Sequence, residues 1–228
     1  ETQNIPLGSP NTLIYLGVGT YNNMLITTMA AYGLSRKDCY WNGKIMKLIA
    51  FTMYFAGGLI PFYLMVKNMN LLDTYSGIIL PVMVNTWNLI VMRTAFAGIP
   101  DSLEESARLD GANDWTILWR IFFPLAQATI AVIALFYAVG WWNNWFNPSI
   151  FLSSKSKYPL QLVLREILLK NDTSAMTQVG SIGQSQQEQY RMLVKYCTII
   201  VATVPILIVY PFLQRYFVKG VMVGSIKG

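Results

Sequence analysis

Five long stretches of this chain contain no charged residue. Three of these stretches have 19 residues and two have 34; they are residues 2–35, 48–66, 74–92, 121–154 and 196–214. A helix needs about 20 mostly apolar residues to cross the hydrocarbon core of a bilayer. The chain as a whole is 54% hydrophobic and 12% charged, and soluble domains carry about a quarter charged residues. The sequence therefore predicts an all-α polytopic membrane protein with five visible spans, and it argues against a large soluble core.

The charges between these stretches set the expected orientation in the membrane. Lys and Arg are enriched in cytoplasmic loops, and residues 36–47 contain four of them against one acid. We therefore expect residues 36–47, the loop 94–119 and the C-terminus to be cytoplasmic, and residues 67–73 and 146–193 to be external. This orientation leaves residue 1 outside, so we expect a sixth span before it, with a removed signal peptide as the alternative.

The net charge of +6 has the same membrane explanation. No basic run of five or more residues occurs, so we expect no nucleic-acid partner. The chain contains no His, which is the commonest metal ligand, and we predict no metal site.

Glycine and proline interrupt several of the apolar stretches. Gly57, Gly58 and Pro61 lie in the second stretch, Pro81 in the third and Pro124 early in the fourth. Proline removes a helical hydrogen bond and kinks the helix, and broken helices are tolerated at membrane depth where protein or water satisfies the backbone. The pattern favours a helix bundle around a pathway, although ordinary packing kinks are an alternative.

The loop 100–120 is the most acidic part of the chain. Ser102 and Glu105 have the spacing of a capping box at the start of a short helix. Gly111 is placed to end that helix in a left-handed conformation, and Asn113 or Asp114 can cap a second helix. Anionic lipid would repel such a loop. We therefore expect a protein partner here, with a solvated surface helix as the alternative.

The spacing in this loop resembles the EAA loop of ABC importer permeases. Glu105-Ser106-Ala107, three residues, Gly111, nine residues, Ile121, one residue and Phe123-Pro124 match every family spacing. Ser106 replaces the family's Ala, and Phe123 replaces its Leu. The resemblance covers nearly the whole chain and is closest to the carbohydrate (MalG-like) branch. The segments 55–61 and 137–140 are similar to the group that imports complex oligosaccharides such as aldouronate, pectin fragments or alginate.

This resemblance implies a type I ABC transmembrane domain over residues 1–228, lacking an N-terminal first span and lying in the bacterial cytoplasmic membrane. The expected partners are a second homologous permease, two ATPase subunits, an extracytoplasmic solute-binding protein, an oligosaccharide and membrane lipid. The chain has no GxxxxGK[ST] phosphate loop, so we expect it to be non-catalytic, with ATP and Mg²⁺ bound by the ATPase subunits. The residues that the resemblance assigns to ATPase coupling are Glu104, Glu105, Ser106, Ala107, Arg108, Asp110 and Gly111.

Two further groups of residues are candidates for contact with substrate and binding protein. Sugar recognition needs aromatic faces together with amide or hydroxyl partners in a concave site. The predicted substrate-path residues are Asn85, Trp87, Asn88, Trp141, Trp142, Asn143 and Asn144. An interfacial aromatic belt is the alternative for these Trp residues. In the external region the resemblance implies a loop that contacts the binding protein through Met176, Gln178, Gln184 and Gln187; a partly disordered linker is the alternative.

Other classes of function are compatible with a membrane protein and stay open at this point. An ABC permease for a non-sugar solute would share the same loop. An ion-coupled carrier would be expected to have ionisable residues within its spans, which the five charge-free stretches lack. An intramembrane enzyme would need a catalytic set in the spans, and we find no His or GxSxG motif.

Overall fold

A computed structural model describes residues 4–38, 41–55, 57–177, 193 and 195–208, and every regular element in these ranges is helical. The elements are α1 Asn4–Ser35, α2 Asn42–Tyr54, α3 Leu59–Asn68, α4 Tyr75–Ile79, η1 Leu80–Val82, α5 Thr86–Ala97, α6 Asp101–Leu109, α7 Asp114–Ile117, the π-helical turn η2 Leu118–Phe122, α8 Phe123–Leu125, α9 Gln127–Trp142, α10 Phe146–Phe151, η3 Lys155–Lys157 and α11 Leu160–Thr177. A further helix covers Lys195–Ile208.

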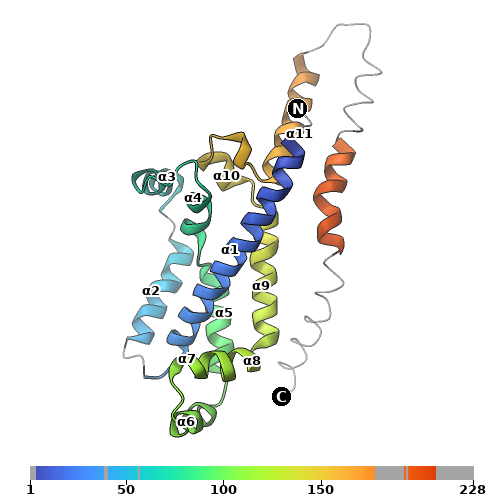
Figure 1. Ribbon diagram of the computed structural model, residues 1–228. Helices are drawn as coiled ribbons and strands as arrows, with labels where there is room; N and C mark the ends of the chain where they lie inside the picture. The colour runs from blue at the N-terminus through green and yellow to red at the C-terminus, as the bar shows by residue number, and fades with distance from the viewer. Residues whose placement is uncertain (1–3, 39–40, 56, 178–192, 194, 209–228) are drawn as a thin grey trace.

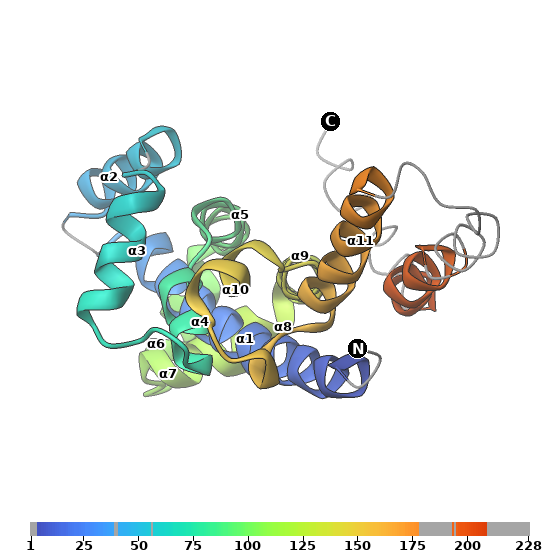
Figure 2. The same cartoon turned by 90° about the horizontal axis from the view of Figure 1, so that it is seen from above.

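The long helix α1 runs through the helix bundle, and several other helices pack against it (Figure 1). It packs most extensively against α5 and α9, and its N-terminal part packs against α11. Seen from above in Figure 2, α2 and α3 lie at one edge, and α11 lies on the opposite side. Close contact between α1 and α9 depends on Gly19, because a Cβ there would lie 2.3 Å from the Trp141 ring.

Three of the charge-free stretches contribute to bent pairs of helices, whereas the described part of the first lies within the continuous helix α1. Among the described helices, none alone meets the length and hydropathy needed to cross a bilayer. Three bent pairs meet both together: Asn42–Tyr54 with Leu59–Asn68 at 115°, Tyr75–Val82 with Thr86–Ala97 at 51°, and Asp114–Leu125 with Gln127–Trp142 at 87°. The breaks fall beside the glycines and prolines that the sequence marked as interruptions.

The fourth stretch corrects one boundary. We expected a single span to begin after Arg120, but the chain turns by 87° between Leu125 and Gln127. Pro124 cannot donate a backbone hydrogen bond, and Ala126 leaves the helical region at φ −97°, ψ 15°. As a result, the helical segment Asp114–Leu125 crosses the end of the bundle, and only the second member of this bent pair, α9, packs along α1.

Two apolar cores lie at opposite ends of α1. One surrounds Tyr32, Phe96 and Phe122, where α1, α5 and η2 meet. The other surrounds Tyr15, Val66 and Phe151. Between them α1 carries buried polar residues, including Asn23 and Thr27. The fold therefore places one polar site at mid-length of α1 and leaves another at the end that carries α6 and α7.

Candidate functional site

Helix α6 begins two residues earlier than the capping-box prediction requires. Pro100 is the N-cap, with no side-chain cap hydrogen bond, so Ser102 lies inside the first turn. The predicted capping box is therefore wrong. Pro100 has an extended conformation, with φ −58° and ψ 133°, and this lets Asp101 start the helix. Glu104, in the first turn of the helix, is buried and forms an ion pair with Arg36.

The end of α6 follows the prediction closely. Gly111 has φ +80°, a conformation that L-residues with a side chain rarely adopt. The amide of Ala112 donates to the carbonyl of Ala107 at 2.9 Å, which closes the helix. Asn113 then caps α7, because its Oδ1 accepts from the Thr116 amide at 2.8 Å. The predicted helix, glycine turn and second helix are all present.

A buried arginine ties α6 to the rest of the bundle. Arg36 follows the last residue of α1 and is 8% exposed. Its guanidinium forms an ion pair with Glu104 and donates to the Phe96 carbonyl at 3.2 Å. The guanidinium carbon also lies 4.3 Å from the centre of the Phe122 ring. One side chain therefore joins α1, α5, α6 and η2.

More exposed ion pairs surround this contact. Arg108 donates to Glu104 Oε1 and to Asp114 Oδ1, each at 2.9 Å, and the hydrogen bond with Glu104 raises the pKa of Arg108. Lys37 forms an ion pair with Asp101, and this hydrogen bond holds the pKa of the Asp101 carboxyl below its ordinary value. We call the set comprising Arg36, Lys37, Asp101, Glu104, Arg108 and Asp114 the Arg36 cluster.

The ion pairs change which acids are available to a partner. The acidic loop is expected to contact a protein partner, but Asp101, Glu104 and Asp114 already have partners within the chain. Glu105 and Asp110 are exposed and form no ion pair with any described residue. A partner can therefore reach two of the five carboxylates without breaking an internal pair.

The same loop exposes large apolar side chains. Leu109 is 89% exposed, Trp115 57% and Leu103 42%. Ala107 is buried against the bundle core, so its small size serves packing within the chain. Ser106 and Gly111 are exposed. Apolar groups beside unpaired acids, on a helix fixed by buried contacts, form a surface suited to docking a protein.

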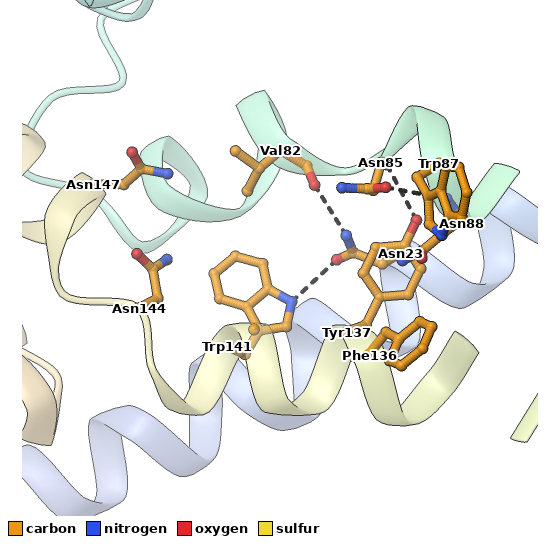
Figure 3. A pocket seen from close by; sticks show the side chains of 11 residues that line it. Asn23, Val82, Asn85, Trp87, Asn88, Phe136, Tyr137, Trp141, Asn144 and Asn147 are labelled. Atoms are coloured by element: carbon orange, nitrogen blue, oxygen red, sulfur yellow. Dashed lines mark hydrogen bonds between the residues drawn. The ribbon is translucent and has the colours of Figure 1, made fainter. Parts of the chain in front are cut away.

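A second site opens at mid-length of α1. A cavity of about 510 Å³ lies between α1, α5, α9 and the segments beside them. Five asparagines and four aromatic residues line most of it, and the lining contains no Asp, Glu, Lys or Arg (Figure 3). We call it the amide pocket; it is lined by Asn23, Val82, Asn85, Trp87, Asn88, Phe136, Tyr137, Gly140, Trp141, Asn144 and Asn147.

Hydrogen bonds fix one wall of the amide pocket. Trp141 donates to Asn23 Oδ1 at 3.2 Å, and Asn23 donates to the Val82 carbonyl at 2.9 Å. The Tyr137 hydroxyl accepts a hydrogen bond from the backbone amide of Asn85 at 3.1 Å. It also shares a 2.8 Å hydrogen bond with Thr27. These bonds, drawn in part in Figure 3, satisfy the backbone where the third apolar stretch breaks.

The pocket gathers most of the predicted substrate-path residues. Asn85, Trp87, Asn88, Trp141 and Asn144 line it. Trp142 and Asn143 do not: the Trp142 indole donates to the Ala202 carbonyl at 3.1 Å, and Asn143 is exposed and donates to Val139.

Sequence reasoning missed three important wall residues: Asn23, Phe136 and Tyr137. An asparagine in an apolar stretch was the signal for Asn23. Nothing local marked the two aromatic residues, because they lie in an apolar helix like their neighbours. The candidates for contact with the binding protein are not placed in the same way. Gln178, Gln184 and Gln187 lie outside the described residues, and Met176 lies near the end of α11.

Comparisons with known proteins agree with the geometry. The family model described as "Binding-protein-dependent transport system inner membrane component" matches residues 24–223. The polygalacturonan/rhamnogalacturonan transport system permease protein YtcP of Bacillus subtilis is 44% identical, over 92% of this chain and 73% of that protein. Protein LplC of the same bacterium is 42% identical, over 92% of this chain and 70% of its own length.

A solved structure has the same fold. It is a bacterial ABC transporter involved in the import of the acidic polysaccharide alginate, and one of its chains superposes with a TM-score of 0.83 at 32% identity. The match covers 94% of this chain and 75% of that one. The predicted family resemblance and the predicted all-α polytopic fold are both confirmed.

Proposed function

Because this chain belongs to the family of binding-protein-dependent transport system inner membrane components, we propose that it is one of two permease subunits in an ATP-driven importer of oligosaccharides from acidic polysaccharides. The relatives whose names mention polygalacturonan, rhamnogalacturonan and alginate support this substrate class. The proposed complex contains a second homologous permease, two ATPase subunits and an extracytoplasmic binding protein. The chain itself is non-catalytic, and ATP and Mg²⁺ are bound by the ATPase subunits. Its C-terminus and α6 face the cytoplasm.

The observation that carries the proposal is the surface of α6. The buried Arg36–Glu104 pair fixes α6 to the end of α1, and Arg36 also bonds to α5. In this proposal a movement of α6 is therefore transmitted to α1 and α5. Its outer surface presents Leu109 at 89% exposure beside the unpaired acids Glu105 and Asp110. In this proposal the ATPase holds α6, and closure of the ATPase moves the bundle.

Charge reversal and steric substitution on α6 test this coupling. We expect Glu105→Lys and Gly111→Leu to abolish ATP-driven uptake in the reconstituted transporter while the protein still inserts in the membrane. Glu105 is exposed, so its reversal does not strain the fold. A leucine at Gly111 would be strained at φ +80° and would project toward the partner.

Gly17→Leu controls for added bulk at an exposed glycine without a positive φ, because Gly17 is exposed and a Cβ there meets nothing within 4 Å. It should transport normally. Full uptake with full substrate-stimulated ATP hydrolysis in both α6 variants would refute the proposal. Uptake of an unrelated solute, with no uptake of any oligosaccharide, would support the non-sugar alternative.

A further inference from the structure

The amide pocket has the size and the chemistry of a small-molecule site. Its volume of about 510 Å³ falls within the range of about 300–1,000 Å³ that is typical of ligand pockets. Asparagine amides both donate and accept hydrogen bonds, as sugar hydroxyls do. Indole and phenyl faces pack against the C–H faces of sugar rings, and Trp87, which is 58% exposed, offers such a face. The lining therefore supplies both kinds of contact that a sugar needs.

One asparagine of the pocket lining keeps a side-chain amide that bonds to no described residue. Asn88 is 5% exposed, and only its backbone amide bonds within the protein, to Asn85 Oδ1 at 3.1 Å. Its side-chain amide forms no hydrogen bond with any residue in the described ranges. Because Asn88 lines the cavity, its side-chain amide is available to a ligand hydroxyl. The side-chain amides of Asn144 and Asn147 also bond to no described residue.

Another part of the lining is preorganised. Trp141 bonds to Asn23, Asn23 bonds to the Val82 carbonyl, and Tyr137 accepts from the backbone amide of Asn85 at the start of α5. Their side chains therefore keep their positions before a ligand arrives, and this lowers the entropic cost of binding. The pocket thus combines fixed side chains with unpaired amides, the arrangement expected of a binding site rather than of a packing defect.

Because the lining contains no charged side chain, the pocket is suited to neutral groups of a ligand and not to its carboxylates. An ionised carboxylate moved into a partly buried site without a countercharge is penalised, whereas hydroxyls are matched by amides. We infer that the amide pocket is a sugar subsite carried by this chain, which holds a ring of the passing oligosaccharide through its hydroxyls and one C–H face and not through its carboxylate. The inference rests on the proposed function and deepens it.

Uptake by the complete transporter tests the subsite. The transporter, with both permeases, the ATPase subunits and sugar-saturated binding protein, is reconstituted in proteoliposomes. A neutral and a uronate-containing oligosaccharide of equal length are compared. Asn88→Leu and Asn144→Leu keep the side-chain size and remove the hydrogen-bonding groups. We expect each to lower the maximal uptake rate of both sugars by the same factor, about tenfold for one lost hydrogen bond that discriminates at the transport step.

A neighbouring asparagine provides the control. Asn22 lies outside the lining, next to Asn23, and its side-chain amide donates to the Val18 carbonyl within α1. Asn22→Leu should transport like the unmodified protein. Unchanged uptake in both pocket variants would overturn the subsite, as would an effect on the uronate sugar alone. If the unmodified transporter imports no oligosaccharide, the proposed function fails as well.

Discussion

The Arg36 cluster and the amide pocket are both polar sites on α1, but they satisfy their polar groups in opposite ways. In the Arg36 cluster the buried guanidinium and carboxylate are paired within the chain. In the amide pocket the buried Asn88 side chain is left without a described partner. The first arrangement joins helices, and the second leaves hydrogen-bonding capacity for a ligand.

Helix α5 connects the two sites. Asn85 and Asn88 are at its start, and Phe96, whose carbonyl accepts from Arg36, is at its end. A helix of 12 residues is about 18 Å long, and only Gly98, Ile99 and Pro100 separate it from α6. The amide pocket therefore lies at the start of α5, and the Arg36 cluster lies at its end. A short helix between them is the arrangement expected if ligand contact and ATPase contact are linked.

Removing one partner of the buried ion pair should have the largest effect. Arg36→Leu leaves Glu104 buried with only Arg108 to pair with, and breaking a buried pair costs about 3 kcal/mol. We expect a large fall in thermal stability in detergent. The double variant Arg36→Leu with Glu104→Leu should lose less than the sum of the two single variants. Additive losses would show that the two side chains do not form the stabilising pair described here.

A methyl group at Gly19 should disturb the amide pocket without touching the Arg36 cluster. The added Cβ would lie 2.3 Å from the Trp141 ring, so the ring must move and its bond to Asn23 should weaken. Overpacking of this kind costs about 1–3 kcal/mol. We expect Gly19→Ala to be less stable and to import sugar slowly, whereas Gly17→Ala should match the unmodified protein. Normal uptake by Gly19→Ala would show that the Trp141 position does not matter.

The contact of Asp73 with residues 153–154, at the other end of the bundle, tests whether a charged side chain stabilises the fold there, as it does in the Arg36 cluster. Asp73, between α3 and α4, accepts from Ser154 Oγ at 2.6 Å and from two backbone amides of the 153–154 segment. The bonds from Ser154 hold the pKa of Asp73 well below its ordinary value. Because its folded-state pKa is lowered, the Asp73 carboxylate stabilises the fold fully above the unfolded pKa of about 4, and this contribution decreases as the pH falls from that value toward the folded-state pKa.

Thermal unfolding between pH 6 and pH 3 measures the Asp73 contribution. The unmodified protein should lose more stability over this interval than Asp73→Asn, which is already less stable at pH 6. Parallel curves for the two proteins would show that this carboxylate does not contribute through its charge.

The exposed pair in the Arg36 cluster should have the smallest effect. Lys37 and Asp101 have side-chain exposures of 82% and 48%, and exposed pairs contribute little because water and salt screen them. We expect Lys37→Gln to leave the unfolding temperature nearly unchanged. A loss as large as that of Arg36→Leu would mean that burial does not separate the two kinds of pair.

The sequence predicted local features better than it predicted contacts between distant segments. Gly111 and Asn113 were identified because a glycine turn and an asparagine cap are local signals. The role of Ser102 was misassigned since Pro100 also serves as a helix start. Asn85, Trp87 and Asn88 were proposed for the substrate path as a cluster of suitable side chains. The Asn23–Trp141 bond joins residues 118 positions apart, and no local pattern indicates which face of α9 meets α1.

In the proposed function, a separate ATPase subunit binds α6 and moves the helix bundle through it. Site-specific cross-linking tests it directly, after Cys39 and Cys197 are replaced by Ser. In the purified, ATP-hydrolysing transporter, Glu105→Cys and Leu109→Cys should cross-link to the ATPase subunit in high yield. Ser149→Cys, exposed on α10 at the opposite end of the bundle, should not. No cross-link from either α6 position, or an equal yield from Ser149→Cys, would contradict the claim.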